Sequence, residues 1–385
     1  MTDFLDEIVG DSEYKHDIPL KKEFQAWHRP RKQFVRKNQW ASEIKKLIED
    51  NPNINQPINY IGLPGKELID IRYFSEEILS KNNIKLRFLG FNKEAQVDGP
   101  ERIELNTSLH EVKSNQFIDD SSNVSWDDFN SLSSTSSIAY QEARKKGPFT
   151  IVNLDLCDGV GKNRPNQGGN NYYNAIYNLL GIQSKSLSPW LLFLTTRTDR
   201  DNIHQEVIET LTDQYLSTLN ECEEFKSSSQ INFMISCKDE LDNAVADPSG
   251  LFNIFTTSLC NWFFSNLKEH RPPTNVKLES IFSYNVSNKN EEDDIISICI
   301  KCKPTFDIGS DPYLLAKGKD DIAEQSKCSL ATKTISRIKS RKNIDKVLSE
   351  APHIYDAMVD ESAKLLSLAR FDETLYRKWV KDYKS

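Results

Sequence analysis

Short apolar runs bounded by turn residues recur along this chain and alternate with stretches in which apolar residues follow a helical period. The runs that predict strands lie at residues 58–63, 84–91, 149–156 and 190–197. Helices are predicted between them, at residues 66–81, 101–112 and 172–180. Because strands that are apolar on both faces belong to parallel sheets covered by helices, the pattern predicts an α/β fold.

The pattern changes after a long apolar helix predicted at residues 251–267. Residues 276–286 and 294–303 alternate apolar and polar side chains around a turn, which predicts an antiparallel β-hairpin. A short strand is also predicted at residues 231–235, and two or more helices follow residue 304. We therefore expect three parts. They are a basic helical extension at 1–50, a mostly parallel sheet with a terminal hairpin at 51–310, and a helical extension at 311–385.

Polar residues gather at the carboxyl end of the strand predicted at residues 149–156. Asn153, Asp155 and Asp158 lie there, just before Gly159 and Gly161. In open α/β sheets, ligands bind in the crevice beyond the carboxyl ends of the strands. These three residues are therefore candidates for catalysis. Either aspartate by itself would serve equally well as the cap of a turn or of a following helix.

Glycine and polar residues also follow the strands predicted before this one. They are Gly62, Gly65, Asn92, Glu94, Asp119 and Asp120. The two glycines form a tight turn, where the backbone can approach a ligand closely, and the helix that follows favours an anion at its N-terminus. The two aspartates follow a short third strand predicted at residues 117–118. The turn would form equally well with no ligand bound.

The net charge of −8 conceals two basic stretches. Residues 21–46 carry nine Lys or Arg against two Glu, and residues 333–346 carry six against one Asp. A phosphate-contacting surface with an aromatic member, as found in nucleic-acid-binding proteins, is predicted at Arg29, Arg31, Lys32, Arg36, Lys37 and Trp40. The alternatives are a solvated amphipathic helix packed on the main domain, and arginines that point inward to pair with acidic strand ends.

The seven cysteines are scattered, and their odd number predicts free thiols in a reducing cytoplasm. Cys299 and Cys302 form a lone C-x-x-C inside an alternating strand pattern, so we expect no four-ligand zinc site and no other metal. We find no signal peptide pattern, and no apolar run approaches the roughly 18 residues of a membrane span. The composition predicts a cytoplasmic protein without a membrane partner.

Strand–helix alternation that closes on an antiparallel hairpin resembles the class I, Rossmann-like S-adenosylmethionine-dependent methyltransferases, over roughly residues 51–303. The segment Ile61-Gly62-Leu63-Pro64-Gly65 is similar to the glycine loop of that family, which cradles the methionine part of the cofactor. The resemblance implies that residue 92 or 94 binds the ribose hydroxyls and that residues 119 and 120 lie beside the adenine. It also places residues 153–156 at the catalytic position.

The sequence departs from that family at two motifs, so the resemblance also allows a degenerate member. Tyr60 stands where an acidic residue usually precedes the first glycine, and Leu154 follows Asn153 where DNA amino-methyltransferases have a Pro-Pro pair. The resemblance implies a methyltransferase that acts on nucleic acid or protein, with Asp155 or Asp158 as the base and Asn153 orienting the acceptor. A place in a bacterial defence or modification system would suit such an enzyme.

The alternative is a catalytically inactive Rossmann-like adaptor that holds nucleic acid or a protein partner through its basic helices. The cofactor hypothesis makes a prediction about the placement of five residues. If the cofactor hypothesis is right, Gly62, Gly65, Asn92, Asp119 and Asp155 converge around a single cleft at the carboxyl ends of the strands.

Overall fold

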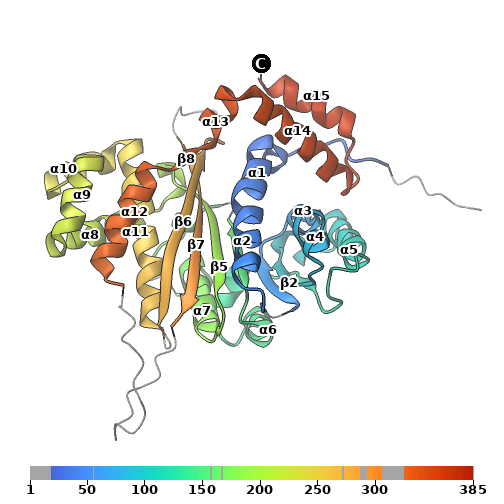
Figure 1. The fold of residues 1–385 in the computed structure, drawn as a ribbon, viewed down its shortest axis with the longest axis horizontal. Coiled ribbons are helices and arrows are strands. Elements are labelled where there is room, and N and C mark those ends of the chain that lie inside the picture. The colour runs from blue at the N-terminus through green and yellow to red at the C-terminus, as the bar shows by residue number, and fades with distance from the viewer. Residues whose placement is uncertain are drawn as a thin grey trace, which may run out of the picture.

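The computed structural model describes residues 19–54, 56–156, 158–165, 168–270, 273–286, 293–305 and 325–384. Its centre is a twisted eight-stranded sheet in the order β3-β2-β1-β4-β5-β7-β6-β8 (Figure 1). The strands are β1 (Ile58–Gly62), β2 (Leu86–Phe91), β3 (Asn123–Ser125), β4 (Ile151–Asp155), β5 (Trp190–Arg197), β6 (Thr274–Tyr284), β7 (Ile295–Pro304) and β8 (Lys342–Asn343).

The first five strands are parallel, and β7 runs antiparallel to both of its neighbours, β5 and β6. The predicted α/β class, with a mostly parallel Rossmann-like sheet and a terminal β-hairpin, is therefore confirmed. The short strand β8 pairs in parallel with β6, so the hairpin is one strand removed from the edge of the sheet.

Strand β4 lies between β1 and β5 in the middle of the sheet, as its sequence predicts. Ile151, Val152 and Leu154 are each at most 2% exposed, because helices cover both faces of the strand. Asp155 ends the strand, so its carboxylate lies at the carboxyl edge of the sheet. That edge is where the loops after β1, β2 and β4 meet.

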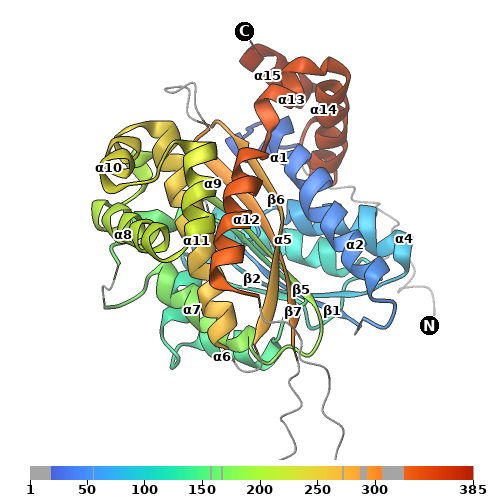
Figure 2. The same ribbon diagram turned by 60° about the vertical axis from the view of Figure 1, so that its left-hand side comes forward.

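One face of the sheet is covered by the helices from both ends of the chain and by those after β1 and β2 (Figure 2). The helices of this layer are α1 (Pro30–Val35), α2 (Ser42–Asp50), α3 (Ile69–Phe74), α4 (Ser80–Asn82), α5 (Pro100–Lys113), α13 (Ile344–Glu350), α14 (Pro352–Ser367) and α15 (Glu373–Lys384). The π-helical turns η2 (Arg36–Ala41) and η3 (Ser75–Leu79) join α1 to α2 and α3 to α4.

The other face is covered by α6 (Ile138–Lys146), α7 (Tyr172–Gln183), α11 (Pro248–Glu269) and α12 (Lys327–Lys339). A small helical lobe projects beyond them (Figure 1). It consists of α8 (Gln205–Glu221), α9 (Glu223–Phe233) and α10 (Lys238–Ala246). The short strand predicted at residues 231–235 is wrong, because Ile231 lies in α9, whose backbone hydrogen bonds are made within the helix. Short 3-10 turns complete the described chain: η1 (Ala26–His28), η4 (Lys93–Gln96), η5 (Phe129–Ser133), η6 (Val160–Lys162) and η7 (Arg200–Asn202).

A disulfide joins Cys222 to Cys328, with their Cα atoms 5.7 Å apart. The prediction that all the cysteines are free is therefore wrong for this pair, which packing brings together across 106 residues of sequence. The thiols of Cys237, Cys260, Cys299 and Cys302 are free; Cys157 lies outside the described residues.

Residues 299 and 302 of the C-x-x-C sequence belong to different hydrophobic clusters, one on each face of β7. A separation of three residues along a strand places side chains on opposite faces, so these two thiols cannot share a ligand. Among the described helices, none combines the length and the apolar character needed to cross a membrane.

Candidate functional site

The carboxyl edge of the sheet brings together four of the five residues expected to converge. Gly62 pairs with Gly90 of β2 and with Asn153 of β4, which fixes the ends of these three strands side by side. Asn92 follows β2, and its amide donates to the carbonyl oxygen of Pro64 at 3.2 Å, beside Gly65. The loops after β1 and β2 are thus tied together next to the end of β4.

Asp119 and Asp120 do not lie at this edge. The backbone N–H of Asp119 donates to the carbonyl oxygen of Leu86, the first residue of β2, so both aspartates are near the amino edge of the sheet. The expectation that Asp119 joins the cleft is wrong, because the third strand is β3, which begins after these aspartates. Ile118 makes only an isolated bridge to Leu86.

Asp119 instead has a local structural role. Arg87 contacts its carboxylate at 3.2 Å, and the backbone N–H of Ser121 donates to it at 3.0 Å. Burial by itself would raise the pKa of Asp119, but the hydrogen bonds from Ser121 and Arg87 outweigh burial and lower the pKa to about 2. The carboxylate therefore stabilises the loop before β3.

Asp155 is held by a side chain from the N-terminal helix. The Nζ atom of Lys32 in α1 lies 2.6 Å from Oδ1 of Asp155 and 4.7 Å from the centre of the Trp40 ring. The Lys32 side chain is 7% exposed and the Asp155 side chain 23%. Burial tends to lower the pKa of Lys32, but Asp155, Tyr284 and Asp70 outweigh it and raise the pKa, so the ammonium stays charged.

A second ion pair lies beside the first. The Nε atom of Arg36, one helical turn after Lys32, is 2.6 Å from Oδ1 of Asp70 at the start of α3. Both side chains are at most 10% exposed. The two pairs fasten the N-terminal helix across the carboxyl edge. The alternative in which basic residues point inward is therefore what the structure contains. Lys32 pairs with the end of strand β4, and Arg36 pairs with a residue of helix α3.

The space next to Gly62 is filled by the protein itself. A methyl group on Gly62 would lie 2.5 Å from the Tyr60 hydroxyl oxygen and 2.7 Å from the Tyr60 ring. A methyl group on Gly90 would lie 2.7 Å from the Pro64 side chain. These glycines thus accommodate neighbouring rings. Burial and the nearby Asp70 carboxylate hold the pKa of Tyr60 well above its ordinary value, so the phenol remains protonated.

The other predicted residues of this edge differ in their surroundings. The Asn92 oxygen caps η4 by accepting from the backbone N–H of Glu94 at 3.0 Å, and the Glu94 side chain is exposed. Asn153 is 1% exposed on β4. Asp158 lies 3.5 Å from both Lys93 and Lys162, which links the loops after β2 and β4.

The residues predicted to form a nucleic-acid surface do not form one continuous surface, because some of them are buried and others are exposed. Lys32, Arg36 and Trp40 are at most 6% exposed, so as folded here they offer no surface to a polynucleotide. Lys37 is exposed and forms an ion pair with Glu361 of α14. Trp40 packs against Phe193 of β5, so the aromatic member predicted for this surface belongs to the buried face of the helix.

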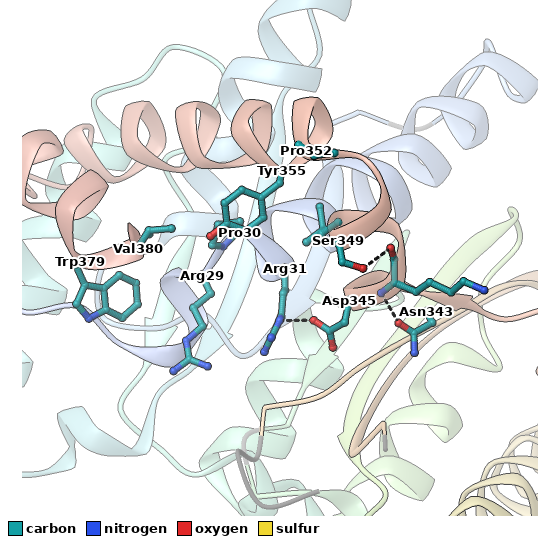
Figure 3. A pocket seen from close by; sticks show the side chains of 12 residues that line it. Arg29, Pro30, Arg31, Asn343, Asp345, Ser349, Pro352, Tyr355, Trp379 and Val380 are labelled. Carbon is teal, nitrogen blue, oxygen red and sulfur yellow. Dashed lines mark hydrogen bonds and ion pairs between the residues drawn. The ribbon is translucent and has the colours of Figure 1, made fainter. Parts of the chain in front are cut away.

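The remaining two arginines line a pocket that the sequence did not reveal (Figure 3). Arg29 and Arg31, at the start of α1, face α13, α14 and α15 across a cavity of about 590 Å³. Lys346, from the second basic stretch, lines the same cavity. Both basic stretches could be recognised in the sequence, but no feature of the local sequence indicates that they lie beside each other in the fold.

A family model described as PP_RS20740-like matches residues 21–381. The chain belongs to the PP_RS20740-like family. The match extends over the N-terminal helix, the sheet and the C-terminal helices, so all three are parts of the family's pattern. That description names no reaction and no ligand, and a search of curated proteins finds no match.

Proposed function

We propose that this chain is a non-catalytic, nucleic-acid-binding subunit built on a Rossmann-like fold. The observation that carries the proposal is the ion pair between Lys32 of α1 and Asp155 of β4, with its charged atoms 2.6 Å apart. Asp155 is one of the two residues, with Asp158, that the methyltransferase resemblance would use as a base. Because Lys32 already occupies Oδ1 of this carboxylate, a methyl acceptor could bind there only by displacing the lysine, which would leave a buried ammonium without a partner.

The residues present do not fit S-adenosylmethionine. The Tyr60 ring fills the space beside Gly62, and the amide of Asn92 is engaged in the cap of η4 and in a bond to Pro64. Asp119, which the resemblance would place beside the adenine, belongs to the opposite edge of the sheet. We therefore derive no methyl-transfer step for this chain.

Support for an anionic partner comes from the meeting of the two basic stretches. Arg29 and Arg31 from the first stretch and Lys346 from the second line one cavity, although some 315 residues separate them in sequence. Binding through phosphates requires such a concentration of positive charge and not an overall positive net charge.

Isothermal titration calorimetry tests the non-catalytic part of the proposal. We expect no saturable heat when S-adenosylmethionine or its demethylated product is titrated into the intact chain, with a methyltransferase of known affinity as a control in the same buffer. A saturable heat for either compound would overturn the proposal and favour the methyltransferase hypothesis. A melting curve on the same sample establishes that the titrated chain is folded.

The nucleic-acid part has a separate test. A fluorescein-labelled single-stranded oligonucleotide should bind the intact chain, with an affinity that falls linearly on logarithmic axes as salt concentration rises. The slope reports the number of phosphates contacted. Absent or salt-independent binding would remove nucleic acid as the partner.

A further inference from the structure

The cavity between α1 and the C-terminal helices combines positive charge with aromatic rings (Figure 3). Its cationic lining residues are Arg29, Arg31 and Lys346, and among the described residues that line it, Asp345 is the one acid. Tyr355 of α14 and Trp379 of α15 supply the rings. A volume of about 590 Å³ lies within the range of pockets that enclose small ligands, roughly 300–1,000 Å³.

Arg31 is held in position before any ligand arrives. Its Nε atom lies 2.5 Å from Oδ1 of Asp345, and its Nη1 donates to the carbonyl oxygen of Asn285. Asp345 is itself fixed, because it accepts from the backbone N–H of Asn285 at 2.7 Å. A guanidinium held this way loses little conformational freedom on binding an anion.

Lys346 supplies an adjustable charge on the other side of the cavity. Its backbone N–H donates to the Asn343 side chain at 2.8 Å, while its own side chain is exposed and its Nζ lies 3.8 Å from Glu350. An exposed ion pair at that distance contributes little stability, so an incoming phosphate can compete for the ammonium.

Trp379 offers an aromatic surface, and contacts with two neighbouring aromatic rings hold it in position. Its ring centre lies 5.4 Å from Phe24 and 5.9 Å from Tyr376, and the side chain is half-buried. Figure 3 shows the Trp379 ring beside the Arg29 side chain, with Arg31 extending from the same helix. A flat ring adjacent to cations matches a flat base attached to a phosphate.

We propose that this cavity binds one nucleotide unit, with its phosphate at Arg29, Arg31 and Lys346 and its base against Trp379. That the unit belongs to a single-stranded nucleic acid rests on the function proposed above; a free mononucleotide carries the same chemistry. The acidic residue Asp345 orients Arg31 and leaves a net positive lining of three cations against one carboxylate.

Fluorescence polarisation with a labelled 15-nucleotide strand tests the site, with unlabelled mononucleotide as a competitor. Lys346→Glu should weaken oligonucleotide binding about tenfold. It should also reduce the salt slope by about 0.7 for each phosphate of the single strand that the variant no longer neutralises. Trp379→Leu removes the stacking surface and should also weaken binding about tenfold. Melting curves establish that both variants are folded.

Lys333→Glu is the matched control. It makes the same charge change at an exposed position of α12 that does not line the cavity, and it should leave the affinity within about twofold. Equal weakening by Lys333→Glu and Lys346→Glu, or unchanged binding in both pocket variants, would overturn the assignment of the site and leave nucleic-acid binding itself intact. Saturable binding of a fluorescently labelled mononucleotide by a chain that does not bind the strand would support the pocket and overturn the proposed function.

Discussion

At the scale of single residues, the environment of Lys32 decides how the carboxyl edge can be used. The lysine and Asp155 were predicted separately, one as a surface cation and the other as a catalytic carboxylate, and the structure joins them at 2.6 Å. A buried ion pair loses much of the hydration of both charges, so removing one partner leaves the other without compensation. The pair therefore fixes the position of α1.

Lys32→Met provides the test at this scale. We expect the free energy of unfolding to fall by about 2–4 kcal/mol in urea denaturation, because Asp155 loses its ammonium partner. Adding Asp155→Asn in the same chain should recover part of the loss, since the uncompensated charge is removed.

The exposed Lys37 of the following turn is the control for this experiment. Lys37→Met removes an ion pair with Glu361 whose lysine side chain is 45% exposed, and it should change the free energy of unfolding by less than about 1 kcal/mol. If Lys32→Met and Lys37→Met are equally mild, the buried pair does not anchor the helix.

At the scale of secondary-structure elements, the helical lobe of α8, α9 and α10 is joined to the rest of the molecule by a disulfide. Its hydrophobic cluster is small, and it is completed by Ile254 of α11, the next helix, and by residues of α12, which comes much later in the chain. The disulfide between Cys222 and Cys328 joins the start of α9 to α12. A crosslink over so long a segment restricts the unfolded chain substantially.

Cys222→Ser isolates the contribution of this link. The serine hydroxyl can still accept from the N–H of Phe225, which Cys222 Sγ accepts at 3.2 Å, so the cap of α9 is preserved. We expect the free energy of unfolding to fall by about 2–4 kcal/mol in non-reducing buffer, with reductant producing a similar loss in the unmodified chain.

The exposed free Cys237 supplies the matched comparison, and Cys237→Ser should leave the melting temperature unchanged. Alkylation of the denatured chain without reductant, followed by mass spectrometry, should leave Cys222 and Cys328 unlabelled. Labelling of both would show that the bond is not formed in the purified protein, and the stability loss should then be absent as well.

At the scale of the whole molecule, the two ends of the described chain pack against each other. The backbone N–H of Lys21 donates to the carbonyl oxygen of Arg370 at 2.8 Å, and the backbone N–H of Asp372 donates to the carbonyl oxygen of Lys21 at 3.0 Å. Phe24 contacts Phe371 and Tyr376, with ring centres 5.6 and 5.4 Å apart. The N-terminal helices and the last three helices, α13 to α15, are therefore one packed layer on the sheet (Figure 1), whereas α12 covers the other face.

His28 lies inside this layer and makes it sensitive to pH. The Tyr376 hydroxyl donates to the His28 carbonyl oxygen at 2.7 Å, and the imidazole is 2% exposed. Burial, together with the positive charges of Arg36, Lys21 and Lys66, lowers the pKa of His28 to about 3. In the unfolded chain the pKa returns to about 6.5. Between these values the unfolded state binds more protons, so stability is lost as the pH falls from about 6.5 toward 3.

Urea denaturation at pH 7 and pH 5 should show this linkage. His28 accounts for a loss of about 2 kcal/mol between the two values, and His28→Asn should remove that part of the pH dependence, whatever its effect on absolute stability. His353→Asn, at an exposed position of α14, should preserve the full dependence. An identical pH slope in His28→Asn and the unmodified chain would contradict the buried, neutral state of His28.

Local sequence determined most of the fold. The apolar runs at β1, β2, β4 and β5 and the alternating pair β6 and β7 were predicted with boundaries close to those observed. Burial on both faces of a strand requires a continuous apolar run, and burial on one face requires alternation, so both are visible in the residues themselves. The gathering of residues 62, 65, 92 and 155 at one edge followed from the same information, since parallel strands place their carboxyl ends together.

Tertiary structure decided what those residues contact. Lys32 and Asp155 are 123 positions apart, and Arg29 and Lys346 are further apart still, so no local pattern reports that either pair is brought together. An amphipathic basic helix has the same sequence whether its charges face solvent or buried carboxylates. Likewise, Phe117-Ile118 has a strand-like composition but makes only an isolated bridge to β2, and the strand that pairs with β2 at this edge is β3. The order of helices and strands could therefore be predicted from the sequence. The ion pairs across the carboxyl edge, the disulfide and the cavity lined by basic and aromatic residues exist only because distant segments pack together.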